Sequence, residues 1–505
     1  MKYTDIHKTY TDIRKMIYTA IHKNIYLSAA FLLSIATTSC NEFLDITPDG
    51  QEKQETIMQT PEGIESALYG VYSQMRTTSL YGSNLSFKVL DIMAQHFTVY
   101  GGNNDHLEAL ANYDYTYSGV QDDFENIWTA MYNNISNVNA VIGCDLLSSD
   151  NLSYPYNIYK GEALGLRAFM HFDLMRIFTE QYTLNPSAQG IPYATTFSLD
   201  TPDFSTAAEC YDHILSDLLE AERLLADEDK YGNKGKYGDD GKSGNEGKYS
   251  NEDGFMKDRQ IHFNLHAVRA TLARVYLTMG RKGEALAYAK KVIEESGRKL
   301  TGTISLYGDV AGILSNNETI FGIYYNEFYS IVSPNLQQHV SWSSLEPRRD
   351  CKDLFSRDGE DLRLSAYFQD DLAYSVPTFI KLTDVYELNG MSRPADIIPG
   401  INLIRLPEMY YIVAECLMDD DPMLATEYFD TVIEHRGLTK LGDRPTPVAL
   451  SLDVIDAERY KEFWGEGQSF FNFKRRDAEI TLPDEMKVKP VYVVPVPDVE
   501  FDYRR

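Results

Sequence analysis

The pattern that most constrains this chain is a tandem pair of amphipathic helical stretches within residues 265–296. The sequence HAVRATLARVYLTMGRKGEALAYAKKVIEES sets apolar residues at helical spacing before and after Gly280. Ala273 and Ala285 lie twelve residues apart, which is the offset between the small residues that let two antiparallel tetratricopeptide helices approach closely. Such a pair buries its apolar face against neighbouring pairs. The pattern therefore predicts a scaffold of stacked helix pairs.

Weaker patterns elsewhere favour the same mainly α architecture. Residues 409–437 repeat the motif, with Ala414 and Ala425 one residue closer together than in the first pair. Apolar helical registers also run through four earlier stretches, 61–75, 122–147, 156–178 and 207–225. We therefore predict a tetratricopeptide-like helix-pair scaffold, with helical parts at about 60–226, 260–298 and 402–476.

Residues 300–400 lose this helical periodicity. The segments ETIFGIYYNEF (318–328) and SVPTFIKLTDVYEL (375–388) are typical of short strands between loops. The tail PVYVVPVPD (490–498) is expected to be extended, because its prolines are incompatible with a helix interior. This part of the chain is predicted to be rich in loops and short strands.

Residues 227–256 differ from the rest in composition. They contain a degenerate six-residue repeat (KYGNKG, KYGDDG, KSGNEG), with glycine at every third position from 232 to 247. A segment with so few apolar side chains cannot bury enough surface to offset its ordering entropy. We predict a disordered insertion.

A short apolar run near the N-terminus ends at a cysteine. The run, Ile25–Ala36, follows Lys23 and is shorter than the roughly 20 residues that span a bilayer. Small residues then lead to Cys40, which resembles the lipobox of a bacterial lipoprotein, although Thr37 stands where leucine is usual. The prediction is a signal peptide over residues 1–39 and a lipid on Cys40, with an ordinary signal peptide as the alternative.

Charge and side-chain chemistry narrow the function classes. The net charge of −28 makes nucleic acid a poor partner. The other cysteines stand singly in apolar patterns, which favours free buried thiols: Cys144, Cys210, Cys351 and Cys416. His262 and His266 have helical metal-ligand spacing but no third ligand, so they are predicted to be core or capping residues. No cofactor, metal or catalytic motif is predicted.

Several motifs in order resemble one family. They are Trp128, Tyr132, Ile135 and Asn139; the segment GEALGLRAFMHFDLMRIF (161–178), with Gly190, Ile191 and Pro192 after it; HILSDLLEAERLL (213–225); Arg405, Glu408, Ala414 and Glu415; and Glu458, Arg459, Glu462, Glu466, Gly467, Phe471 and Arg475. In this order the chain resembles the SusD/RagB family of outer-membrane lipoproteins. Gln468 and Asn472 depart from the family's usual arginine and aspartate, and the chain lacks the Asn-Pro-rich ending common in the family.

The resemblance implies a single SusD-like domain, an α/α superhelix, over residues 40–505. It also implies a glycan-binding protein anchored to the outer membrane by its lipid and facing the exterior. Such a protein passes oligosaccharides to a SusC-like TonB-dependent transporter and performs no catalysis. Two alternatives remain open: a tetratricopeptide-type adaptor that assembles surface proteins, and a surface glycoside hydrolase.

Glycan binding requires flat aromatic faces together with polar groups that exchange hydrogen bonds with sugar hydroxyls. Trp128 and Trp464 lie in helical registers and are predicted to be core residues, whereas Trp342 lies in a polar segment. Family members often contact ligand through the stretch before the Trp128 helix. The candidate glycan-binding residues are Phe97, Tyr100, Asn103, Asn104, Tyr113, Tyr115, Tyr325 and Trp342.

Overall fold

The computed structural model divides the chain into a unit that ends at Ile57 and a body from Met58 to Arg505. The residues that it describes are 57–99, 105–148, 152–228, 254–301, 317–336, 345–370, 376–383, 391–394 and 397–502, with 314, 386 and 504. Cys40 and the insertion residues 229–253 lie outside this set. Within it, no helix combines the length and apolar character needed to cross a membrane.

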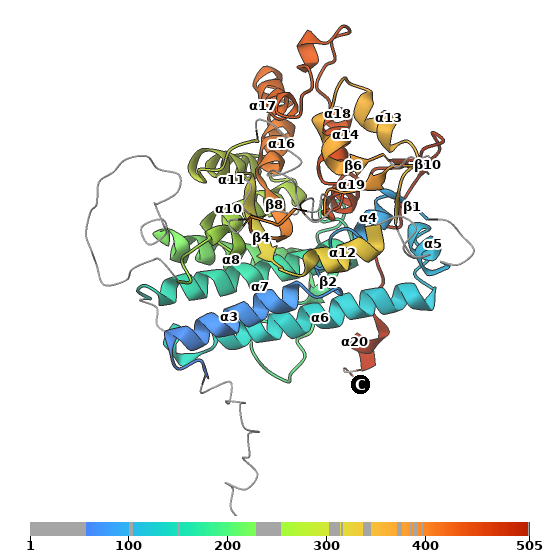
Figure 1. Ribbon diagram of the computed structural model, residues 1–505. Helices are drawn as coiled ribbons and strands as arrows, with labels where there is room; N and C mark the ends of the chain where they lie inside the picture. Colours follow the sequence, from blue (N-terminus) through green and yellow to red (C-terminus); the bar gives the residue numbers. More distant parts are fainter. Residues whose placement is uncertain are drawn as a thin grey trace, which may run out of the picture. The chain divides into compact units, whose positions relative to one another are not determined.

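Four long helices lie side by side in the body (Figure 1). They are α3 (Pro61–Met75), α6 (Ser118–Ile142), α7 (Tyr156–Phe178) and α8 (Ala207–Leu225). Thr60 caps α3, and Thr206 forms a capping box with Glu209 at the start of α8. Helix α7 is buried on nearly every side, so it is the central helix of this layer. The predicted ranges of α3, α7 and α8 are confirmed.

The two predicted helix pairs are also present. They are α10 (Leu265–Thr278) with α11 (Lys282–Glu295), and α16 (Leu406–Leu417) with α17 (Pro422–Glu434). Helix α11 packs on α16, so the pairs stack. The alanines that define the motif are fully buried between the helices: Ala273, Ala285, Ala414 and Ala425. The mainly α helix-pair scaffold is therefore confirmed.

The region between the helix pairs contains more helix than its sequence predicts. Strand β4 (Thr319–Tyr324) matches the first predicted strand and pairs antiparallel with β8 (Gly400–Arg405). The second predicted strand is reduced to β7 (Thr378–Phe379), which pairs with β6 (Phe368–Gln369). Three short helices occur here: α12 (Phe328–Leu336), α13 (Cys351–Ser356) and α14 (Leu362–Tyr367). The prediction of loops between the two strands was wrong for these helices; in α12, Phe328, Val332 and Leu336 bury one helical face at four-residue spacing.

The remaining elements are short. They are α4 (Val89–Met93), β1 (Phe97–Thr98), α5 (Asp105–Ala111), η2 (Asp145–Leu147), β2 (Gln189–Pro192), β3 (Phe204–Thr206), η3 (Arg259–Ile261), β5 (Glu346–Pro347), η4 (Leu441–Asp443), α18 (Leu452–Glu462), α19 (Gln468–Arg476), β9 (Ile480–Thr481), β10 (Lys487–Val488) and α20 (Asp498–Asp502). The proline-rich residues 490–497 form no helix or strand, as predicted. Cys144, Cys210, Cys351 and Cys416 are free thiols.

A buried ionic cluster joins the irregular region to the helices. At its centre, Glu462 of α18 accepts hydrogen bonds from Arg405 (2.8 Å), Arg436 (2.9 Å) and Arg363 (3.0 Å). Burial by itself would raise the pKa of Glu462, but the three guanidinium groups outweigh it and hold that pKa well below its usual value. Each arginine comes from a different part of the chain, so the cluster fixes how those parts pack.

The acidic residues in the family motifs form buried ion pairs. Glu408 pairs with Arg274, Glu415 with Arg475, and Glu458 with Arg363. Glu466 similarly pairs with Lys381 and Arg405. All four carboxylates are buried, and each joins two elements of the fold.

Replacing Glu462 with glutamine is expected to lower the free energy of unfolding by about 3–5 kcal/mol, because it removes the negative charge that three buried arginines share. Urea denaturation at pH 7 measures this loss. The matched control is Glu220→Gln, which breaks an exposed pair with Arg223 and is expected to cost less than about 1 kcal/mol. Equal losses in the two variants would contradict the role of the cluster.

Acidification provides a second test, in which the wild type is compared with Glu462→Gln. The pKa of Glu462 is depressed in the fold, so its contribution is fully present above its unfolded pKa of about 4.3 and is lost as pH falls towards the folded pKa. The stability difference between the wild type and Glu462→Gln is therefore expected to shrink below about pH 4. A difference that grows on acidification would contradict the depressed pKa.

Candidate functional site

Two chain segments that are far apart in sequence meet in a small antiparallel sheet. Strand β1 pairs with β5, with Phe97 opposite Pro347 and Thr98 opposite Glu346. The Arg348 amide also donates to the His96 carbonyl at 2.9 Å. The predicted site residues Tyr100, Asn103, Asn104 and Trp342 lie outside the described residues, in the segment after β1 and the segment before β5. Strand β1 precedes the first segment and β5 follows the second, so one border of each segment lies at this sheet.

A buried carboxylate fastens this sheet to the helical scaffold. Asp91 of α4 accepts hydrogen bonds from the amides of Gly467 (3.0 Å) and Gly465. Its other contact is the Nδ1 atom of His96, at 3.0 Å. His96 stacks on Trp464, with ring centres 4.5 Å apart. Burial lowers the pKa of His96, so the ring is neutral at pH 7 and its packing does not change with small shifts in pH.

Gly465 and Gly467 have positive φ angles of 83° and 69°. Side chains rarely adopt these angles, and a Cβ atom at Gly467 would lie 2.3 Å from the Leu85 carbonyl oxygen. Glycine at these two positions therefore permits the turn that presents both amides to Asp91.

Two of the predicted glycan-binding residues have buried side chains. The Phe97 ring is 2% exposed and packs edge-to-face on Phe379 and Trp464. The Tyr113 ring is 6% exposed, and its hydroxyl donates to the Met93 carbonyl at 2.8 Å. Neither side chain presents a face to a ligand. Both side chains instead pack in the core and support the segment that runs from α4 to α5.

Tyr115 and Tyr325 are half-buried and lie in separate surroundings. The Tyr115 hydroxyl donates to the Val491 carbonyl at 2.6 Å, so this residue ties the C-terminal tail to the turn before α6. The Arg76 guanidinium lies 5.2 Å from the centre of the Tyr325 ring. In the sequence, Tyr325 comes before α12, whereas the segment that contains Trp342 comes after it. Helix α12 has nine residues and is therefore about 13 Å long.

The structure reveals an exposed aromatic pair that the list of candidates omitted. The His106 and Tyr117 rings are nearly parallel, at 6° and with centres 6.3 Å apart, and Tyr117 is 37% exposed. The His106 Nε2 atom lies 2.7 Å from an Asp123 carboxylate oxygen. A Cβ atom at Gly119 would come within 3.2 Å of both rings, so the absence of a side chain there gives them room.

A tight turn holds Tyr117 in place. Asp114 accepts hydrogen bonds from the Thr116 amide (3.0 Å) and hydroxyl (2.6 Å), and these bonds lower the pKa of Asp114. Tyrosine occupies every second position from 113 to 117. This regular spacing does not by itself indicate which of the three rings is exposed to solvent. His106 follows directly after residues 100–104, and the exposed pair therefore lies beside one of the predicted binding segments.

The predicted core positions of the two tryptophans and of His262 are confirmed. Trp128 and Trp464 are buried in the core. His262 is also buried, with Nδ1 lying 3.3 Å from a Glu162 oxygen. Over the described part of the chain, no group of three or more His, Cys, Asp or Glu side chains is arranged to hold a metal ion.

Comparison with known proteins places this fold in a family. A family model described as "Starch-binding associating with outer membrane" matches residues 42–234, and one described as "SusD family" matches residues 381–499. The SusD-like protein P38 of Formosa agariphila is 26% identical over 213 residues. That match spans 40% of this chain and 38% of the relative, well under two thirds of its length.

Solved structures agree in fold. A SusD superfamily protein from Bacteroides thetaiotaomicron superimposes with a TM-score of 0.68 at 22% identity, covering 87% of this chain and 97% of its own. Surface glycan-binding protein A from Bacteroides fluxus gives a TM-score of 0.61 at 19% identity, covering 88% and 97%. The two family models show that the chain belongs to the SusD/RagB family, as its motifs predicted, and these solved structures share its fold.

Truncation to alanine tests the difference in burial between Phe97 and Tyr117. Phe97→Ala is expected to lower the free energy of unfolding by about 3–5 kcal/mol, because it leaves a cavity against Trp464. Tyr117→Ala removes an exposed ring and is expected to cost less than about 1 kcal/mol. Guanidinium denaturation compares the two variants, and a larger loss for Tyr117→Ala would contradict this placement.

Proposed function

We propose that this protein is a cell-surface glycan-binding lipoprotein that captures oligosaccharides and delivers them to a SusC-like TonB-dependent transporter. The observation that carries the proposal is the His106–Tyr117 ring pair, in which Tyr117 is exposed, close in sequence to one of the predicted binding segments in a member of the SusD/RagB family. The description of one matching family model, starch binding in association with the outer membrane, supports the same class of ligand.

The chemistry of the pair suits a sugar. Nearly parallel aromatic rings offer a flat apolar surface to the C–H groups of a pyranose ring, while the polar edges remain available to hydroxyls. Asp123 accepts a hydrogen bond from His106 Nε2 and so orients the imidazole. In the proposal, Tyr100, Asn103, Asn104 and Trp342 add aromatic and amide contacts from the two neighbouring segments. Tyr115 and Tyr325 are further proposed glycan contacts at the edges of the binding surface.

The binding role requires no reaction step. The carboxylates of the family motifs are buried in ion pairs with arginine or lysine, which suits packing rather than acid–base chemistry. Reducing-sugar assays on the glycans that bind are expected to detect no release. Turnover of a bound glycan would instead favour the surface glycoside hydrolase.

Glycan affinity tests the aromatic pair directly. Tyr117→Ala and Trp342→Ala are each expected to weaken binding to the responsive glycan by about tenfold, since loss of one stacking contact costs on the order of 1 kcal/mol or more. Isothermal titration against a panel that includes starch oligosaccharides measures this change. The matched control is Phe197→Ala, which removes an exposed ring between β2 and β3 and should leave affinity unchanged.

Two results would contradict the proposed site. The first is unchanged affinity in Tyr117→Ala and Trp342→Ala alike. The second is an equal loss in Phe197→Ala, which would mean that the effect is not local. Failure of the wild-type protein to bind any glycan on the panel would favour the adaptor alternative.

The proposed anchor has a separate test. Cys40→Ser removes the thiol that a lipid would acylate, and it is expected to abolish incorporation of labelled palmitate and to release the protein from the membrane fraction. Retention of the label in Cys40→Ser would contradict the lipobox prediction, whereas the folded body and its glycan affinity are expected to be unaffected.

A further inference from the structure

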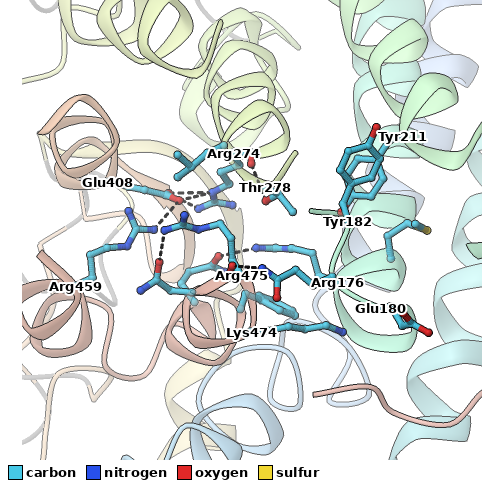
Figure 2. A pocket seen from close by; sticks show the side chains of 16 residues that line it. Arg176, Glu180, Tyr182, Tyr211, Arg274, Thr278, Glu408, Arg459, Lys474 and Arg475 are labelled. Atoms are coloured by element: carbon cyan, nitrogen blue, oxygen red, sulfur yellow. Dashed lines mark hydrogen bonds and ion pairs between the residues drawn. The ribbon is translucent and has the colours of Figure 1, made fainter. Parts of the chain in front are cut away.

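A second candidate site is a pocket whose lining includes neither His106 nor Tyr117. Its walls come from the C-terminal ends of α7 and α10, the start of α16, and helices α18 and α19 (Figure 2). The floor is formed by buried side chains, among them Arg274, Glu408, Arg459 and Lys474. The rim is formed by half-buried residues, including Gln181, Thr278 and Gln468.

The pocket holds more positive than negative charge. Five cationic side chains line it: Arg176, Arg274, Arg459, Lys474 and Arg475. Three of them have close carboxylate partners, since Arg176 pairs with Asp173, Arg274 with Glu408 and Arg475 with Glu415. Glu180, the other acidic residue of the lining, is exposed at the edge and accepts a hydrogen bond from Asn185.

Two cations are left without a close counter-charge. The ionic contact of Arg459 is long, with Nη2 lying 3.7 Å from a Glu408 oxygen that Arg274 already binds at 2.7 Å. Lys474 donates to the Ile177 carbonyl at 3.2 Å. A protein with a net charge of −28 therefore buries one arginine and one lysine in this pocket without a close counter-charge. Buried charge is unfavourable unless something compensates it.

Hydrogen-bond donors in the same pocket are also left over. The Nε and Nη1 atoms of Arg459 and the Nη1 atom of Arg274 are buried and find no hydrogen-bond partner among the described residues. Both side chains are more than nine-tenths buried. Figure 2 shows Arg459, Arg274 and Arg176 converging from different sides of the pocket. Guanidinium donors that converge in this way match the acceptor geometry of an oxyanion.

We propose that this pocket binds a compact oxyanion, a carboxylate, sulfate or phosphate group, through Arg459 and Arg274. The bound group supplies the missing negative charge and accepts the unpartnered guanidinium hydrogens. Burial and the nearby Arg176 lower the pKa of Lys474 to about 7, which is the behaviour of a cation that lacks its counter-charge. The anion comes either free from solution or as the acidic group of a sugar.

Substitution of Gln468 can place a negative charge in the pocket with little change in side-chain size. Its Oε1 atom accepts a hydrogen bond from Arg176 Nη1 at 3.2 Å. Gln468→Glu keeps the size of the side chain and places a carboxylate at the same position. We expect it to weaken anion binding at least tenfold. The matched control is Gln121→Glu, which makes the same change in net charge at an exposed position on α6.

The test is isothermal titration of the full body with sodium sulfate, phosphate, acetate and glucuronate, each in constant chloride. The expected result is saturable binding of at least one anion to the wild type and to Gln121→Glu, with a loss of tenfold or more in Gln468→Glu. Preference for glucuronate over the inorganic ions identifies an acidic sugar as the source, and the reverse preference identifies a free ion.

A second variant guards against an ambiguous result. Arg459→Gln removes the central cation and is expected to abolish binding while the circular dichroism spectrum stays unchanged. Absence of saturable binding in the wild type, or equal affinities in the wild type and Gln468→Glu, would overturn the proposal. Neutral-glycan affinity should not change in Gln468→Glu, so failure here is distinguishable from failure of the proposed glycan site.

Discussion

The fold depends on the pairing of charges that are buried away from water. Glu462 binds arginines from β8, from the end of α17 and from α14, and a carboxylate at 0% exposure tolerates no looser arrangement. Removing a partner from such a cluster leaves an uncompensated charge, so alternative packings of the irregular region are unfavourable. Helix pairs provide the scaffold, and this cluster determines where the short strands and helices between residues 317 and 383 attach to it.

The same principle extends outwards to the proposed binding surface. Asp91 is buried, and its partners are two backbone amides at glycines with positive φ angles and one imidazole. Through these contacts α4 and β1 are held against the turn between α18 and α19, and the β1–β5 sheet is held with them. Rigid support beneath exposed rings reduces the ordering entropy that ligand binding would otherwise have to overcome.

Periodicity in the sequence predicted the helices well, because a buried helical face leaves a pattern within a short window. The bounds of α3, α7 and α8 follow from it. Non-local pairing leaves no such pattern. Phe97 lies in a polar, aromatic stretch that is typical of a binding loop, yet pairing with Pro347 turns its ring into the core. Tyr117 was not predicted for a similar reason, since its stacking partner His106 lies on α5, whereas Tyr117 lies just before α6.

The sheet that joins the two proposed binding segments consists of only two residue pairs. Its hydrogen bonds are made by the backbone, and Phe97 and His96 pack beneath it. Backbone pairing does not depend on the side chains of the adjoining sequence, so a different sequence can be attached to these anchor points. In engineering terms, the protein has a ready-made grafting point, at which a new recognition sequence can be installed on an unchanged support.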